Sequence, residues 1–168
     1  MSHFVVNFLK KLLLGTCIIA LVLSATALVG CSQPADPCGM MESFANSYPL
    51  MGIIYSPRIP QQEEGHVGKE FFTSLFGEGE RYVADYAVIF TSAPDAVGEC
   101  SVLVCHSEYE ALLAADMCRR RLDMLGKMSN SLDTSSLTDS FVIKSGKIVV
   151  MSALPDNALS RNIWRKIL

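Results

Sequence analysis

The chain has 168 residues and a mass of 18.4 kDa, which allows one ordinary domain with a short extension and excludes two large domains. Half of its residues are hydrophobic, which excludes wholesale disorder. Lys10 and Lys11 are the only Lys or Arg before position 31, so the rest of the chain carries 12 basic and 17 acidic side chains. This acidic balance argues against a nucleic-acid binder, which needs a basic surface.

The first 30 residues have the order of an export signal. Lys10 and Lys11 precede an uncharged run from Leu12 to Gly30. As a helix this run is about 28 Å long, close to the ~30 Å core of a bilayer. A basic start, an apolar run and a small-residue end are typical of a secretory signal peptide. We therefore predict a signal peptide over residues 1–30 and export of the remaining chain.

The end of this run resembles the lipobox of bacterial lipoproteins. It reads Leu28-Val29-Gly30-Cys31 and is followed by a polar, proline-containing segment. In that family the cysteine thiol is joined to a diacylglycerol unit, and a lipoprotein signal peptidase cuts just before the cysteine. The resemblance implies cleavage between Gly30 and Cys31, with the acylated Cys31 as the new N-terminus. It also implies membrane lipid as a partner and a lipid-anchored location on the extracytoplasmic side of the cell membrane.

Three alternatives compete with lipidation. Ala25-Thr26-Ala27 fits an A-x-A cleavage site, which would release a soluble protein. The apolar run could instead remain as an uncleaved membrane helix, or Cys31 could be an unmodified cysteine. We favour lipidation because position, cysteine and flanking residues agree.

The remaining chain is predicted to hold a lipidated N-terminus and short linker over residues 31–43 and one domain over residues 44–168. Its predicted N-terminal half contains a short helix within 40–51, an irregular loop over 55–70, a short helix near 71–77, and strands at 83–91 and 99–105. Ser107 and Glu110 have capping-box spacing at the start of a long helix that ends at Gly126. Its predicted apolar face consists of Tyr109, Leu112, Leu113, Met117 and Met124.

The C-terminal part is predicted to contain a polar loop, a hairpin and a final helix. Ser145-Gly146 separates two β-branched runs at 141–144 and 147–151, which is a hairpin pattern. The last helix is predicted over 156–168. The element order after the helical lead-in is strand, strand, helix, strand, strand, helix. This order predicts an α+β fold, with an antiparallel sheet of about four strands and helices packed on one face.

Four sequence features in order resemble a bacterial lipoprotein family called domain of unknown function 4358. The features are Tyr86-Ala87-Val88, Gly98-Glu99-Cys100-Ser101-Val102, Arg121-Leu122 and Val142-Ile143-Lys144-Ser145-Gly146-Lys147-Ile148-Val149-Val150. The similar region spans about residues 44–153. The family is known for small exported lipoproteins, chiefly of Firmicutes, and has no assigned activity. The resemblance therefore implies a location and a fold, and implies no chemistry.

Four cysteines besides Cys31 lie in the exported part, namely Cys38, Cys100, Cys105 and Cys118. Export permits disulfides, and four cysteines allow three pairings. Strand alternation places Cys100 and Cys105 on opposite faces, so we do not expect them to pair with each other. Either could meet Cys118 if the long helix packs on its face. The competing interpretation is that all four are buried free thiols.

Other polar residues give weak signals for chemistry. Cys105 and His106 are adjacent at a strand end and point apart, which disfavours a thiol–imidazole pair, and His66 lies far away in the loop. Zinc needs three or four converging ligands, and no C-x-x-C pair is present. Three consecutive basic residues lie in the predicted long helix, namely Arg119, Arg120 and Arg121. We interpret this basic triple as a solvated helix face, with Asp116 and Asp123 as ion-pair partners.

Acidic pairs are interpreted as solvated loop charge, not as acid–base pairs. They are Glu63 and Glu64 with Glu70, and Glu78 with Glu80.

We therefore predict no catalytic, cofactor-binding or metal site. The expected function is a non-enzymatic binding or interaction module of the cell envelope, with an envelope protein as a candidate partner. The alternative is a small thiol-redox or hydrolytic enzyme that uses Cys100, Cys105 or Cys118.

Overall fold

The computed structural model describes residues 34–49, 52–91, 98–128 and 135–168. The chain divides into two compact units, Met1–Ala35 and Asp36–Leu168. The predicted signal peptide and Cys31 lie outside the described residues, as do residues 92–97 of the predicted turn and residues 129–134 of the polar loop. The folded domain is the second unit.

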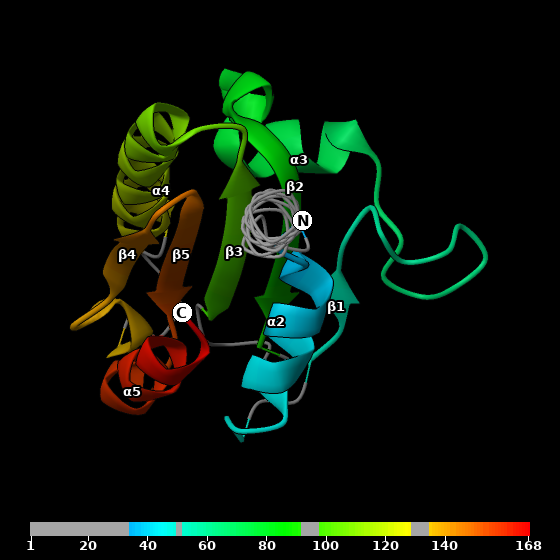
Figure 1. Ribbon diagram of the computed structural model, residues 1–168. Coiled ribbons are helices and arrows are strands. Elements are labelled where there is room, and N and C mark those ends of the chain that lie inside the picture. The colour runs from blue at the N-terminus through cyan, green and yellow to red at the C-terminus, as the bar shows by residue number, and fades with distance from the viewer. Residues whose placement is uncertain (1–33, 50–51, 92–97, 129–134) are drawn as a thin grey trace, which may run out of the picture. The chain divides into compact units, whose positions relative to one another are not determined.

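The sheet of this domain has five antiparallel strands, against about four predicted. Their order across the sheet is β1-β2-β3-β5-β4 (Figure 1). The strands are β1 (Ile54–Tyr55), β2 (Val83–Phe90), β3 (Glu99–Cys105), β4 (Phe141–Ser145) and β5 (Ile148–Ala153). β1 was not predicted because two residues are too few to show an alternating pattern. The predicted α+β class with an antiparallel sheet is confirmed.

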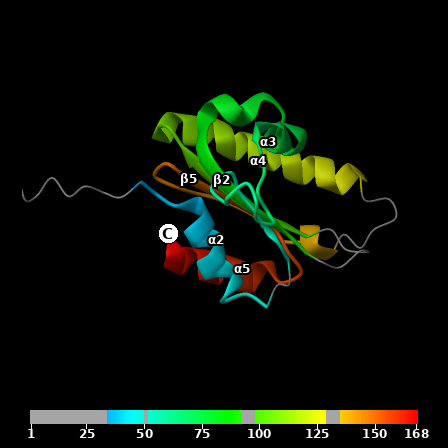
Figure 2. The same ribbon diagram turned by 90° about the vertical axis from the view of Figure 1, so that its right-hand side faces the viewer.

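Helices cover both faces of the sheet, whereas the sequence predicted them on one face. α2 (Pro37–Ala45) and α5 (Asn157–Ile167) pack on one face, and α3 (Lys69–Phe76) and α4 (Glu108–Met128) pack on the other (Figure 2). In β2, Ala87 is buried on the α2 side and Val88 on the α4 side. Both alternating sets of side chains in this strand are apolar, so each face of the sheet needs its own cover.

The domain begins at Asp36, earlier than the predicted residue 44. Asp36 is the N-cap of α2, because its side chain accepts a hydrogen bond from the Cys38 backbone N–H at 3.1 Å. Pro37 occupies the first turn, where a missing N–H has no cost. Met41 and Phe44 of α2 are fully buried. Residues 37–43 therefore belong to the packed domain, and the linker after Cys31 is shorter than predicted.

Helix α4 starts where the capping pattern predicted, and it buries only part of the predicted apolar face. The Glu110 backbone N–H donates to the Ser107 hydroxyl at 3.1 Å, and that hydroxyl donates to the Glu110 carboxylate at 2.7 Å. Tyr109, Leu112 and Met124 of the predicted apolar face are 70%, 53% and 40% exposed, whereas Met117 of that face is buried. Besides Met117, the buried side chains of α4 in the core on this side of the sheet are small, namely Ala111, Ala114, Ala115 and Cys118. Small residues allow the helix to lie close to the sheet.

The C-terminal hairpin and helix follow the prediction closely. β4 and β5 pair around a two-residue turn at Gly146 and Lys147, one residue later than the predicted turn at Ser145-Gly146, because Ser145 pairs with Ile148. Gly146 has φ of 54°, in the left-handed region that glycine adopts readily. The Asp156 side chain caps α5 by accepting from the Leu159 N–H at 2.8 Å. Two short 3-10 helices complete the fold, η1 (Glu78–Tyr82) and η2 (Ser135–Leu137).

The interpretation of the basic triple as a solvated face is wrong for Arg121, which is largely buried and paired with Glu99. Its guanidinium donates two hydrogen bonds to one carboxylate oxygen of Glu99, at 2.7 and 3.1 Å. The Arg121 side chain is 11% exposed and the Glu99 side chain is 2% exposed. Arg119 pairs with Asp116 on the exposed face, as predicted. One of the three arginines therefore joins α4 to the start of β3 inside the domain.

Candidate functional site

A cleft of about 410 Å³ opens at the end of the sheet where β2 begins and β3 ends. Its floor is aromatic, since Phe72 of α3 and Tyr86 of β2 line it and are both buried. Its wall carries charges of both signs and an imidazole. These polar lining residues are Lys69, Glu80, Arg81, Asp85 and His106. A concave site with an apolar floor and a few polar groups is the usual form of a ligand-binding site.

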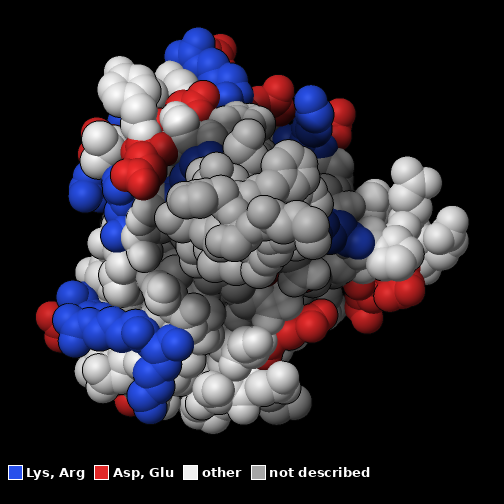
Figure 3. All heavy atoms as spheres, in the orientation of Figure 1, with Lys and Arg blue, Asp and Glu red and all other residues white. Residues whose placement is uncertain are grey.

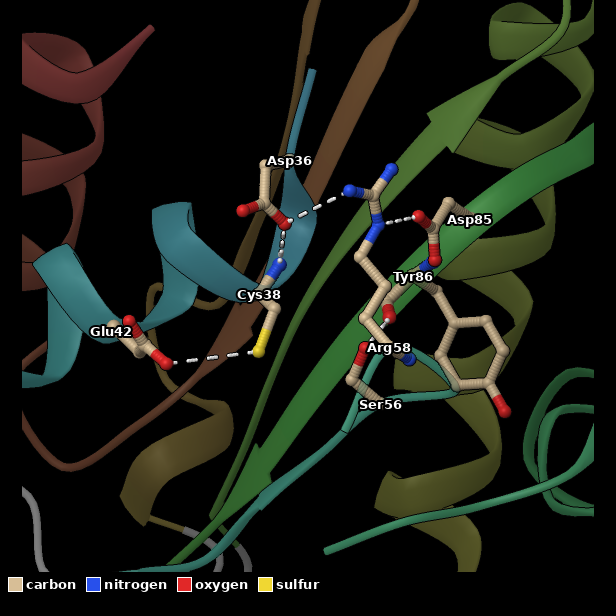
Figure 4. Close-up of polar contacts among 7 residues, drawn as sticks. All are labelled: Asp36, Cys38, Glu42, Ser56, Arg58, Asp85 and Tyr86. Carbon is tan, nitrogen blue, oxygen red and sulfur yellow. Dashed lines mark hydrogen bonds and ion pairs between the residues drawn. The ribbon is translucent and has the colours of Figure 1, made fainter. Parts of the chain in front are cut away.

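Asp85, one of the lining residues of this cleft, pairs with Arg58 of the irregular loop (Figure 4). Arg58 Nε donates to the Asp85 carboxylate, and Arg58 Nη1 lies 3.6 Å from Asp36 Oδ1. The hydrogen bond to Asp85 is the main cause of a raised pKa for Arg58, with the charges of Asp85 and Asp36 adding to it. The Arg58 guanidinium thereby joins the irregular 55–70 loop to the start of α2 and to β2.

The loop that carries Arg58 is held to the sheet by a buried serine. The Ser56 hydroxyl donates to the Tyr86 carbonyl oxygen at 2.9 Å and accepts from the Arg58 backbone N–H at 3.2 Å. The Ser56 backbone N–H donates to the Gly65 carbonyl at 3.0 Å, which closes the loop. His66 Nδ1 lies 2.6 Å from the Ile59 carbonyl oxygen and supports the same loop. His66 therefore has a structural contact.

Tyr86 is held neutral on the floor of the cleft. Its hydroxyl donates to the Gly68 carbonyl oxygen at 2.9 Å. Burial, and then the negative charges of Asp85 and Glu70, raise the pKa of Tyr86 to about 12. A phenol with this pKa stays protonated near neutral pH, so Tyr86 contributes an apolar ring and a satisfied hydroxyl.

The structure separates Cys105 from His106. The Cys105 side chain is buried in the core beneath α4, and His106 is exposed in the cleft wall. Adjacent residues at the end of a strand point in different directions. They do not form a nucleophile–base pair, in agreement with the sequence argument.

The four described cysteines are free thiols. Cys100 and Cys105 face opposite sides of the sheet, as predicted, and Cys105 and Cys118 share the core beneath α4. Burial is the largest cause of a raised pKa for every one of the four, to about 12 for Cys100 and about 11 for Cys105. The thiolate is the reactive form, so this environment disfavours thiol chemistry.

Alkylation of the native protein with iodoacetamide is expected to modify Cys38 first. Cys38 is only half-buried, whereas Cys100, Cys105 and Cys118 are buried. At a pKa of about 11, roughly one thiol in a thousand is ionised at pH 8. Peptide mass spectrometry before and after denaturation measures each site separately. Rapid native labelling of Cys105 would contradict this expectation and would favour the thiol-enzyme alternative.

The glutamates that were interpreted as solvated loop charge lie at the surface. Glu63, Glu64, Glu70, Glu78 and Glu80 are all exposed. Within the described residues, no group of three or more His, Cys, Asp or Glu side chains is arranged to hold a metal ion. The same part of the chain contains no helix that is both long and apolar enough to span a bilayer.

Sequence reasoning missed Asp85 in the lining of the cleft and its partner Arg58. Arg58 lies between two prolines in an irregular loop, where no periodic pattern predicts its position. Asp85 could have been singled out from the sequence, because it is the one charged residue within the strand Val83–Phe90. Its partner comes from a segment 27 residues earlier in the chain, so the pair is visible only in the fold.

No family model, curated protein or solved structure matches this chain.

Proposed function

We propose that this chain is a lipid-anchored protein of the bacterial cell envelope. In this proposal its α+β domain is a non-enzymatic binding module on the outer side of the membrane. The main support for the proposal is the lipobox-like segment Leu28-Val29-Gly30-Cys31, because the apolar run ends there in a small residue followed directly by a cysteine. The resemblance to the family of domain of unknown function 4358 supports the same location.

The position of the domain along the chain fits such an anchor. The compact unit begins at Asp36, only five residues after Cys31. Five extended residues span at most about 18 Å. Each buried methylene of an acyl chain contributes ~0.8 kcal/mol to membrane binding, and two chains give a stable anchor. An acylated Cys31 would hold this domain directly above the headgroups.

The cleft supports a binding role. It combines an aromatic floor with Lys69, Arg81 and Asp85 in its wall. Among its described lining residues, no thiol or serine hydroxyl is held against a base. The cleft therefore suits a small ligand or a peptide segment of an envelope protein that has both apolar and charged parts.

Changing Cys31→Ala is expected to leave an uncleaved precursor and to abolish lipid labelling. The thiol is the acceptor of the diacylglycerol unit in the proposed processing, and alanine has no nucleophile. Metabolic labelling with a fatty acid and mass spectrometry of the purified chain measure both effects. Cys38→Ala is the matched control, because it removes a nearby thiol that has no role in processing.

The expected control result is normal cleavage and normal acylation of the Cys38→Ala chain. Normal processing of the Cys31→Ala chain would refute the anchor. A wild-type chain that starts just after Ala27 without an acyl group would instead support the soluble alternative.

A further inference from the structure

Helices α2 and α5 run in opposite directions, which brings the start of α2 and the end of α5 to the same side of the domain. The Tyr48 hydroxyl, beyond the end of α2, accepts from the Asp156 N–H at the start of α5, at 2.9 Å. Phe44 stacks on Trp164, with ring centroids 4.9 Å apart. Figure 2 shows the C-terminus and the beginning of α2 on the same side.

The turn between β4 and β5 lies on this side as well (Figure 2). The Lys147 carbonyl accepts a hydrogen bond from the Cys105 N–H at 2.9 Å, so the turn adjoins the end of β3. Cys105 in turn pairs with Val83 at the start of β2, beside the cleft. This side of the domain therefore contains the start of α2, the end of α5 and the β4–β5 turn.

If Cys31 is acylated, the short tether to Asp36 favours this side as the one near the membrane. This orientation rests on the proposed anchor. Asp36 lies at most about 18 Å of extended chain from Cys31. The end of α5 is only one helical turn beyond Trp164, which packs on α2.

The end of α5 carries two exposed cations. Arg165 and Lys166 lie in its last turn, and no acidic residue occurs between Asn157 and Ile167. Neither cation has an ion-pair partner among the described residues. Figure 3 shows basic side chains gathered over α5 in the lower left of the view. Asp36 at the start of α2 and Asp85 of β2 are both paired with Arg58.

Arg161, the third basic residue of α5, already has contacts within the domain. Its guanidinium lies 4.6 Å from the centroid of the Phe141 ring, and its Nη2 donates to the Asp139 carbonyl at 3.4 Å. Arg165 and Lys166 are therefore the cations of this helix that remain for a partner outside the domain. They stand out on a chain whose net charge is −3.

We infer that Arg165 and Lys166 form a docking surface for anionic lipid headgroups and hold the domain in one orientation on the membrane. A Lys or Arg near an anionic leaflet favours the bound state by about fivefold. Two cations therefore favour the docked orientation by roughly 25-fold over a freely tumbling domain on the same tether. The cleft beside the start of β2 is then held at the membrane surface, where it faces other membrane-associated molecules.

The single tryptophan of the chain provides the measurement. Trp164 is adjacent to Arg165, so energy transfer from Trp164 to dansyl-labelled headgroups reports the height of α5 above the bilayer. The acylated full chain is reconstituted into phosphatidylcholine vesicles with or without phosphatidylglycerol. Transfer is expected to be higher on the anionic vesicles and to fall to the neutral level in about 1 M salt, where the Debye length is ~3 Å.

The test variant is Arg165→Glu with Lys166→Glu, and it is expected to lose the extra transfer on anionic vesicles. Arg165→Gln with Lys166→Gln removes the charges without reversing them and is expected to lose most of it. The matched control is Arg119→Glu with Arg120→Glu, because this exposed pair on α4 gives the same change in net charge. The control is expected to keep the wild-type transfer. Circular dichroism verifies that each variant is folded.

The outcomes separate the docking surface from the anchor. Equal transfer on the two lipid compositions, or an equal loss in the α4 control, overturns the docking surface and leaves the anchor intact. A wild-type chain that does not float with phosphatidylcholine vesicles overturns the anchor instead. In that case, transfer on added anionic vesicles still tests Arg165 and Lys166.

Discussion

Replacing Arg121 with methionine is expected to lower the free energy of unfolding by about 3–5 kcal/mol. Glu99 is 1% exposed, and the Arg121 guanidinium supplies the hydrogen bonds to its carboxylate. Methionine fills a similar volume, so the loss comes mainly from a buried carboxylate without its partner. Urea unfolding, followed by far-ultraviolet circular dichroism, measures the change.

Two further variants distinguish the ion pair from a general effect on α4. Arg120→Met changes an exposed arginine on the same helix and is expected to cost less than about 0.5 kcal/mol. Glu99→Met combined with Arg121→Met removes both charges and is expected to recover most of the stability, since apolar replacements of buried ion pairs are often neutral. A double variant as unstable as Arg121→Met would contradict the assignment of the cost to an unpaired charge.

The cost of the Arg121→Met change is expected to depend on pH. Burial raises the pKa of Glu99 in the folded protein, and Arg121 lowers it, so removal of Arg121 raises the pKa further. A folded-state pKa above the unfolded value means that the folded protein binds the proton more tightly. The stability of the Arg121→Met variant relative to wild type therefore rises as the pH falls from neutral toward the ordinary pKa of a glutamate. An unchanged deficit between pH 7.5 and pH 5 would argue against this coupling.

Replacing Trp164 with alanine is expected to lower the free energy of unfolding by about 3–5 kcal/mol. Trp164 is fully buried and stacks on Phe44, with ring centroids 4.9 Å apart and an interplanar angle of 11°. Phe44 continues the stack to Tyr48, with a centroid distance of 5.3 Å. The change removes the main contact between α5 and α2. Urea unfolding measures the loss.

A second readout localises the effect of the Trp164→Ala change. Amide hydrogen exchange is expected to increase most in α2 and α5, because these helices lose their shared aromatic contact. Trp164→Phe keeps an aromatic ring and is expected to cost less than about 1.5 kcal/mol. Equal costs for the alanine and phenylalanine variants, or faster exchange confined to α4, would contradict the packing described above.

Local patterns predicted the elements whose signals lie within a few neighbouring residues. Such patterns predict the strand Glu99–Cys105, the start of α4 after Ser107 and, to within one residue, the hairpin of β4 and β5. Alternation, capping and turn preference act over two to four residues, so they can be recognised in a single chain. The opposite orientation of Cys100 and Cys105 followed from the same alternation.

Other features depend on which distant segments meet. Tyr109 and Leu112 have helical apolar spacing, but alanines on the neighbouring face of α4 are the residues that fit against the sheet. Arg121 was interpreted as solvated because Glu99 lies 22 residues away in the chain. The cleft brings together Lys69, Asp85 and His106 from separate elements.

Export and lipid attachment are predictions that depend on contiguous residues, since a targeting segment is recognised as an extended peptide with charge, apolar length and a cysteine in fixed order. The two-sided helical cover, the ion pair of Glu99 with Arg121 and the cleft beside Tyr86 were decided by the tertiary structure. The physical reason is that burial and charge pairing are properties of surfaces in contact. Residues far apart along the chain create those surfaces only when the sheet and its helices have packed.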